Sequence, residues 1–169
     1  VYISGGSDKC GYARTASPIA TNIKWSTENV STGAFQSSNW KTAITDFDVR
    51  GNMTKIIQTA NGNSSKYPAA YTALNYAPSA ILTSKGKWAL PTAGILNSLY
   101  TNLNAINNTI SKLGGTQLTT NNEYIWSSSE ASSKQTWLFL TDRSHGLGAD
   151  GIYGHYKTID GVVRPVIAF

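Results

Sequence analysis

The residue types best suited to chemistry lie together in a glycine-rich stretch from 142 to 161. It holds both histidines of the chain, His145 and His155. An imidazole can act as a catalytic base, and imidazoles with carboxylates bind zinc or iron; the nearby carboxylates are those of Asp142, Asp150 and Asp160. Their spacing matches no standard metal or catalytic motif. We therefore predict no catalytic residue and no metal site, and expect surface histidines.

Motifs for other cofactors are also missing from the sequence. Gly146-Leu147-Gly148 lacks the third glycine and the following amphipathic helix of a dinucleotide site, and no GK[ST] phosphate loop is present. Cys10 is the single cysteine, so it can form neither an internal disulfide nor, by itself, a structural zinc site. We expect no cofactor.

Charge and hydropathy exclude two further classes of function. The chain has 14 Lys and Arg against 9 Asp and Glu, but the basic residues are scattered, whereas nucleic-acid binding normally needs a basic stripe. No apolar run approaches the roughly 18 residues of a membrane-spanning helix. Polar Ser4-Gly5-Gly6 follows Val1-Tyr2-Ile3, where a signal peptide would stay apolar. We expect neither nucleic-acid binding nor membrane insertion.

The glycine-rich stretch also has the composition of a recognition surface. Its rings and charges belong to Asp142, Arg143, His145, Tyr153, His155 and Tyr156. Rigid aromatic rings supply contact area in binding surfaces, and small residues supply adaptability. The same composition also fits an ordinary loop region, and composition alone does not decide between the two.

The element that must position this stretch is predicted most clearly after Pro91-Thr92. Apolar residues recur there at steps of three and four, which predicts one helix of about six turns capped by Gly114-Gly115; they are Leu96, Leu99, Leu103, Ile106, Ile110 and Leu113. Shorter helices are predicted at 53–60 and 69–76. The helix face should pack on a sheet of the strands predicted at 87–90, 124–127, 136–140 and 162–169. Short strands are also predicted at 1–3 and 23–26. Pro165 should place the last strand at an edge or bulge.

Four sequence motifs occur together in a fixed order. They are Lys87-Trp88-Ala89-Leu90-Pro91, Ile125-Trp126-Ser127-Ser128-Ser129-Glu130, Trp137 and Gly161-Val162-Val163-Arg164-Pro165-Val166-Ile167-Ala168-Phe169. The set resembles C-type-lectin-fold domains of the formylglycine-generating-enzyme subclass, found in gut bacterial surface proteins and phages, many of them variable proteins of diversity-generating retroelements. The resemblance covers roughly residues 20–169. It implies an α+β, C-type lectin-like fold with mixed or antiparallel sheets and two helices.

With 169 residues, we predict one domain, in which 1–20 form an N-terminal strand or extension and 123–169 a candidate variable region. In the family, copying errors at template adenines replace Asn codons. Every Asn of this chain lies between positions 22 and 122. The resemblance implies an exposed, diversified ligand-binding surface at Ala131, Leu138, Leu140, Asp142, Arg143, His145, Leu147, Ala149, Asp150, Ile152, Tyr153, His155, Tyr156, Thr158, Ile159 and Asp160. Such codons do not encode Lys134 or Gln135, which we expect to be fixed.

The remaining motif residues are expected to be framework. We predict Trp88, Trp126 and Trp137 in the core and an ion pair between Arg164 and an acid, Glu130 being the candidate. Family members usually carry Glu in place of Ile95 and Arg in place of Ile167. The reactive cysteine pair of the enzymes and the EPN, QPD and WND motifs of calcium-dependent lectins are absent, so the resemblance implies neither oxidase activity nor calcium-mediated sugar binding.

The sequence therefore predicts a non-enzymatic recognition domain that displays a diversified surface to a protein or glycan ligand. The resemblance places it outside the cell, on a bacterial surface or a virion. The alternative is an invariant bacterial adhesin or pilus-tip module of the same fold. A hydrolase of unknown type is a third hypothesis, and it would depend on His145 or His155.

Overall fold

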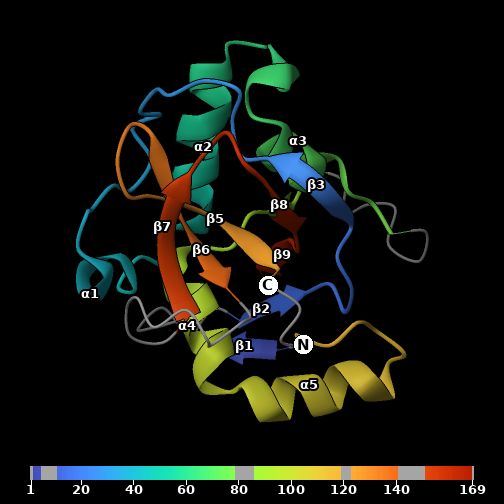
Figure 1. The fold of residues 1–169 in the computed structure, drawn as a ribbon. Helices are drawn as coiled ribbons and strands as arrows, with labels where there is room; N and C mark the ends of the chain where they lie inside the picture. Colours follow the sequence, from blue (N-terminus) through green and yellow to red (C-terminus); the bar gives the residue numbers. More distant parts are fainter. Residues whose placement is uncertain (1, 5–10, 79–85, 119–122, 141–150, 169) are drawn as a thin grey trace.

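The computed structural model describes residues 2–4, 11–78, 86–118, 123–140 and 151–168. These residues form two β-sheets and five α-helices (Figure 1). The predicted α+β class with mixed and antiparallel sheets is confirmed. The two helices implied by the resemblance are too few.

The larger sheet carries most of the described positions of the predicted binding surface. Its strands, in spatial order, are β3 (Ala20–Lys24), β8 (Asp160–Val163), β5 (Tyr124–Glu130), β6 (Gln135–Leu140) and β7 (Ile152–Tyr156). Neighbouring strands are antiparallel except for β5 and β8, which are parallel. β6 is therefore an interior strand, whereas β7 lies at an edge of this sheet.

The smaller sheet joins the first and last described strands of the chain. Its order is β1 (Tyr2–Ser4), β2 (Gly11–Arg14), β9 (Val166–Ala168) and β4 (Trp88–Ala89). The single strand predicted at 162–169 is wrong, because β8 and β9 belong to different sheets. Pro165 separates them, and its lack of an N–H group ends the ladder of β8.

Helices flank the sheets and close the core. They are α1 (Trp40–Ala43), α2 (Val49–Ala60), α3 (Pro68–Asn75), α4 (Ala93–Thr101) and α5 (Leu103–Lys112), with a 3₁₀ turn, η1, at Ser64–Lys66. α2 and α3 confirm the helices predicted at 53–60 and 69–76. The Asp48 carboxylate accepts a hydrogen bond from the Gly51 N–H and so caps α2 at its start. None of the helices in the described segments is both long and apolar enough to cross a bilayer.

The long helix predicted from Pro91 onward is instead two helices that meet at Asn102. The Asn102 side-chain amide donates to the Ser98 carbonyl at 2.9 Å, and the Thr101 hydroxyl donates to the same carbonyl at 3.1 Å. These local bonds replace the regular backbone bond to Ser98 and end α4. Leu113, the last residue of the predicted apolar face, follows the end of α5 and is 64% exposed, whereas Ile106 and Ile110 of α5 are buried.

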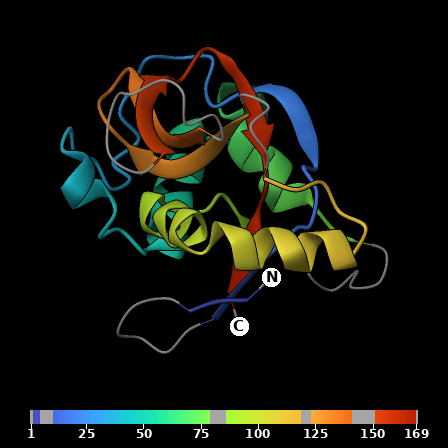
Figure 2. The same cartoon turned by 60° about the horizontal axis from the view of Figure 1, so that its bottom comes forward.

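The apolar core lies between the larger sheet and α2, α3 and α4. Ile56 of α2, Leu96 of α4 and Trp126 of β5 are fully buried in one continuous cluster. Trp88 and Trp137 are also buried, which confirms the three tryptophans as framework. In Figure 2 the larger sheet lies above the core, and β1 and β2 lie below it.

Gly161 provides a test of this packing, because a Cβ atom there would lie 2.5 Å from Cε2 of Trp126. The Trp126 indole cannot easily move away, since it is buried and its Nε1 donates to the Ile23 carbonyl at 2.7 Å. We expect Gly161→Ala to lower the free energy of unfolding by about 1–3 kcal/mol in urea denaturation. The control is Gly154→Ala in β7, where the nearest atom would be 3.4 Å away and a change within about 0.5 kcal/mol is expected. Equal losses in the two variants would contradict the packing.

Candidate functional site

Six of the predicted ligand-binding residues lie outside the described part of the chain. They are Asp142, Arg143, His145, Leu147, Ala149 and Asp150. Cys10 also lies outside it. The described positions of the predicted surface are therefore Ala131 and residues of β6, of β7, of the turn after β7 and of the start of β8.

Four predicted surface positions are buried, and the expectation that they are exposed is wrong. They are Ala131, Leu138, Leu140 and Ile152. Residues 136–140 of β6 are all buried, because the strand has neighbours on both sides and cover on both faces. A ligand on the surface does not reach these side chains.

The other six predicted positions follow β7 and the turn into β8. Tyr153, His155, Thr158 and Ile159 are half-buried, and Tyr156 and Asp160 are exposed. Tyr156, at 53%, is among the most exposed large hydrophobic residues of the described chain. These positions lie between 153 and 160, where the exposed Gly154 and the buried Lys157 separate them; Tyr153, His155 and Tyr156 belong to the edge strand β7, and Asp160 begins the interior strand β8.

Three aromatic rings gather at this edge. The ring centroid of His155 lies 5.4 Å from that of Tyr124 and 6.0 Å from that of Tyr156. We call Tyr124, His155 and Tyr156 the β7 aromatic edge. Tyr124 comes from the start of β5, and sequence reasoning missed it as a site residue because only the folded sheet brings it to His155.

His155 is held in a state that favours the neutral imidazole. Its Nδ1 accepts a hydrogen bond from the Tyr156 backbone N–H at 2.8 Å. Partial burial lowers the pKa of His155 below its usual value. The described residues contain no group of three or more His, Cys, Asp or Glu side chains that could hold a metal ion. The β7 aromatic edge thus offers neutral ring surfaces to a ligand.

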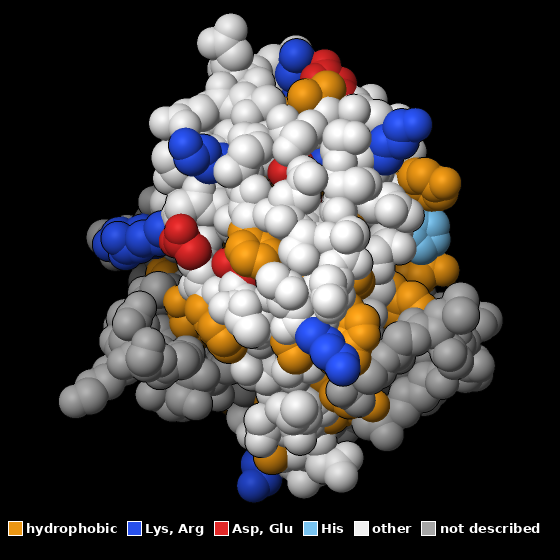
Figure 3. Space-filling view, turned by 90° about the vertical axis from the view of Figure 1, so that its left-hand side faces the viewer, with side chains coloured by type: hydrophobic (Ala, Val, Ile, Leu, Met, Phe, Trp, Pro, Cys, Tyr) orange, Lys and Arg blue, Asp and Glu red, His pale blue; other side chains and the backbone are white. Residues whose placement is uncertain are grey.

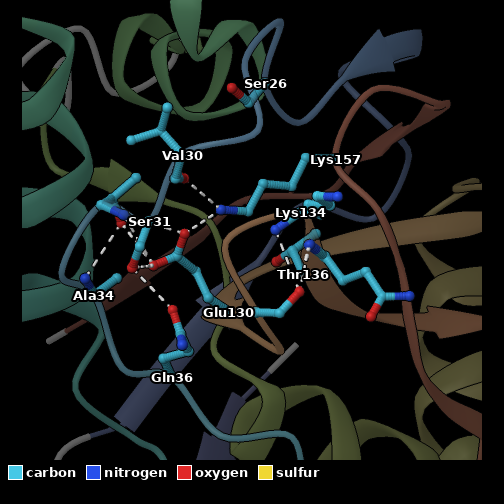
Figure 4. Close-up of polar contacts among 12 residues, drawn as sticks. Ser26, Val30, Ser31, Ala34, Gln36, Glu130, Lys134, Thr136 and Lys157 are labelled. Carbon is cyan, nitrogen blue, oxygen red and sulfur yellow. Dashed lines mark hydrogen bonds and ion pairs between the residues drawn. The ribbon is translucent and has the colours of Figure 1, made fainter.

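A buried ion pair fixes the turn that carries this edge. The Lys157 ammonium donates to the Glu130 carboxylate, and both side chains are completely buried (Figure 4). Lys157 also donates to the Val30 carbonyl at 2.8 Å and lies 4.6 Å from the ring centroid of Trp25. Burial lowers the pKa of Lys157, and its bond to Glu130 opposes that shift. Lys157 follows Tyr156 directly, so its anchoring fixes the end of β7.

The predicted ion pair between Arg164 and Glu130 is wrong. Glu130 is occupied by Lys157 and by the Thr32 N–H and hydroxyl, at 3.1 Å each to Oε2. Arg164 does pair with an acid, but the acid is Glu123, at 3.1 Å. Both motif residues are therefore framework, in two separate clusters.

The serines before Glu130 are also framework. The Ser129 hydroxyl donates to Asp46 at 2.6 Å and accepts from the Ala93 N–H at 2.9 Å, while the Ser127 hydroxyl donates to the Trp137 carbonyl at 2.6 Å. The register of β5 against β6 shifts between Trp126 and Glu130. Side-chain hydroxyls thus satisfy buried groups where the regular ladder is interrupted.

A concave surface lies away from the β7 aromatic edge. It is an open groove of about 820 Å³ between α3 and the segment before β3, lined by Pro18, Ile19, Ser64, Ser65, Pro68, Tyr71, Thr72, Asn75 and Tyr76. It contains two tyrosines and several uncharged polar groups, but no ionisable catalytic pair. The groove is a competing place for a ligand.

On the face that Figure 3 shows, the charges of the described residues give no independent pointer to a ligand. Figure 3 shows a face on which uncharged polar side chains and backbone predominate, with Lys, Arg, Asp and Glu side chains scattered between them. The part of this face that the structure describes has no continuous basic or acidic area. The chemistry available to a ligand there is mostly hydrogen bonding, with apolar contact at the hydrophobic side chains between the polar groups.

Comparison with known proteins shows a related fold. No family model matches the sequence, and no curated protein matches it. Among solved structures, the chain is similar to a fimbrial protein from Bacteroides ovatus ATCC 8483, with a TM-score of 0.62 and 17% sequence identity. The match covers 94% of this chain and 36% of that protein. The chain thus shares the fold of about a third of the fimbrial protein.

The buried ion pair leads to a stability prediction. Glu130→Gln leaves the Lys157 ammonium buried without its counter-charge, and we expect the free energy of unfolding to fall by about 3–5 kcal/mol. The matched control is Glu28→Gln at the Glu28–Lys66 pair, where both side chains are 35% exposed and a loss of at most about 1 kcal/mol is expected. Both are measured by urea denaturation. Similar losses in the two variants would show that Glu130 does not anchor the turn.

Proposed function

We propose that this chain is a non-enzymatic recognition module of a bacterial surface protein, with a C-type lectin-like fold and an adhesin-like role. The observation that carries this proposal is the similarity of nearly the whole chain to part of a fimbrial protein. Fimbriae are extracellular structures, so the proposal includes a location outside the cell. The chain would act as one module of a longer protein.

The proposed binding surface is the β7 aromatic edge, and its ligand is a protein or a glycan. Tyrosine rings present a flat apolar face and a polar hydroxyl, which suits both sugar rings and protein side chains. Tyr156 is more than half exposed while the next residue, Lys157, is fixed in the core. Rings that are held in place lose little entropy on binding.

A fixed surface accounts for the buried positions better than a diversified one. Random replacement of Leu138 or Leu140 would introduce polar or charged side chains into β6, where none could reach water. The absence of Asn after position 122 still favours diversification. Diversified display therefore stands as the second candidate function.

Binding through the β7 aromatic edge is tested by Tyr156→Ala, with Tyr71→Ala in the groove as the matched control. The probes are a printed glycan array and a panel of mucins and extracellular-matrix proteins. We expect Tyr156→Ala to weaken binding at least about tenfold, as for an exposed aromatic hot spot, with an unchanged melting temperature. Tyr71→Ala should retain binding. Loss of binding in Tyr71→Ala alone would contradict this proposal and would show that the ligand binds in the groove.

The two candidate functions differ in the variation expected among isolates. Sequencing the coding stretch for 123–169 in many isolates should reveal no more substitutions at the predicted variable positions than in the segment 92–113. In addition, no near-copy of this stretch that differs at adenines should lie nearby in the DNA. Substitutions concentrated at Leu138, Leu140, Tyr153 and Tyr156 would instead establish diversified display.

A further inference from the structure

Gln135 lies opposite the exposed Tyr156 on the same face of the larger sheet. The two residues pair across β6 and β7. The next residue, Lys157, donates from its backbone N–H to the Lys134 carbonyl at 3.0 Å, and hydrogen-bonded and non-hydrogen-bonded pairs alternate along an antiparallel ladder. Gln135 and Tyr156 therefore form a non-hydrogen-bonded pair, the kind in which side chains from the two strands lie closest together.

The polar groups of this pair are open to a ligand. Gln135 is half-buried and Tyr156 is exposed. Neither the Gln135 amide nor the Tyr156 hydroxyl has a hydrogen-bond partner among the residues that the structure describes, and neither belongs to the buried polar groups that lack one. The amide can donate two hydrogen bonds and accept two, and the hydroxyl can donate one and accept others. Both groups are therefore available at the surface.

Gly154 leaves a step in the surface beside Tyr156. It lies two residues earlier in β7, so its position is on the same face of the sheet, and it is exposed. A Cβ atom there would be in ordinary contact with Cβ of Ala131, at 3.4 Å, and with Cζ3 of Trp137, at 3.8 Å. Glycine in a strand interior weakens the strand and often marks a place where a ligand approaches the backbone closely. A flat ligand can thus lie along the Tyr156 ring without meeting a side chain at position 154.

We propose that the Gln135–Tyr156 pair binds a pyranose ring of a glycan, and that Gln135 selects the sugar by its hydroxyl groups. This assignment rests on the proposed function and names the ligand class of the β7 aromatic edge. A pyranose has an apolar face of C–H groups that packs on an aromatic ring, and adjacent hydroxyls at its rim that match the donor and acceptor of one amide. It needs a flat apolar surface and a two-sided hydrogen-bonding group side by side, which Tyr156 and Gln135 supply.

Saturation-transfer difference NMR of the whole chain tests this assignment, with methyl β-D-galactopyranoside, methyl β-D-glucopyranoside and methyl α-D-mannopyranoside as probes. A single pyranose on an open surface binds weakly, so we expect saturation of its ring C–H protons, with a Kd on the order of 1–10 mM, for at least one probe. Gln135→Leu removes the hydrogen bonds and should weaken this binding about tenfold with an unchanged melting temperature. The matched control, Gln58→Leu at an exposed position of α2, should bind as wild type does.

Monodeoxy forms of the sugar that binds, without its 2-, 3- or 4-hydroxyl in turn, test whether Gln135 contacts the hydroxyls directly. In wild type, loss of either of two adjacent hydroxyls should weaken binding about tenfold. Gln135→Leu should bind these deoxy sugars and the parent sugar equally, because the partner of those hydroxyls is already gone. Equal losses in wild type and Gln135→Leu, or no saturation transfer from any of the three probes, would overturn the assignment.

Two results separate the choice of ligand from the proposed site itself. If Tyr156→Ala weakens binding to a matrix protein that Gln135→Leu binds as tightly as wild type does, the ligand is a protein, and the pyranose assignment alone is wrong. If Tyr156→Ala leaves the binding of sugars and proteins unchanged, the proposed site is wrong as well.

Discussion

The contact between the Glu130 carboxylate and the Lys157 ammonium is the interaction on which the rest of this structure depends. Both groups are fully buried, and such charges are tolerated only when their hydrogen bonds are complete. Completing them requires the Val30 carbonyl, the Ser31 and Thr32 hydroxyls and the Thr32 N–H. The loop before α1 is thereby held against the end of β5 and the turn after β7. Because Lys157 follows Tyr156 directly, this turn also fixes the backbone that carries the exposed Tyr156 ring.

A second polar cluster fixes the opposite side of β5. Asn52 of α2 donates to Asp46 at 2.7 Å and accepts from the Phe35 N–H at 2.8 Å, while Ser129 donates to the same Asp46. Apolar packing alone tolerates many arrangements of similar volume. Buried hydrogen bonds with defined partners select one of them. The Ser127–Glu130 segment thus determines how α2, α4 and the larger sheet fit together.

The sequence predicts the parts of this fold that depend on local pattern. The helices at 53–60 and 69–76 follow from residue spacing and from the turn signals that bound them, and the core tryptophans follow from the resemblance. The break at Asn102 is not predicted, because the apolar repeat continues through it without interruption. Only the structure shows that the Thr101 and Asn102 side chains bond to the Ser98 carbonyl and end α4. The partner of Arg164 and the position of Tyr124 depend on contacts between distant strands. Leu138 and Leu140 were expected at the surface because the resemblance, rather than any alternation in β6, placed them there. Burial on both faces is a property of the assembled sheet.

The central proposal is that a rigid scaffold presents the β7 aromatic edge to a ligand. Hydrogen exchange tests it most directly, with the tightest binder found among the glycans, mucins and matrix proteins added to the chain. The account predicts slower exchange at 152–160 and around Tyr124, with no change in 64–76 along the groove. Protection confined to 64–76, or spread through β5 and β6 as a general stabilisation, would contradict it.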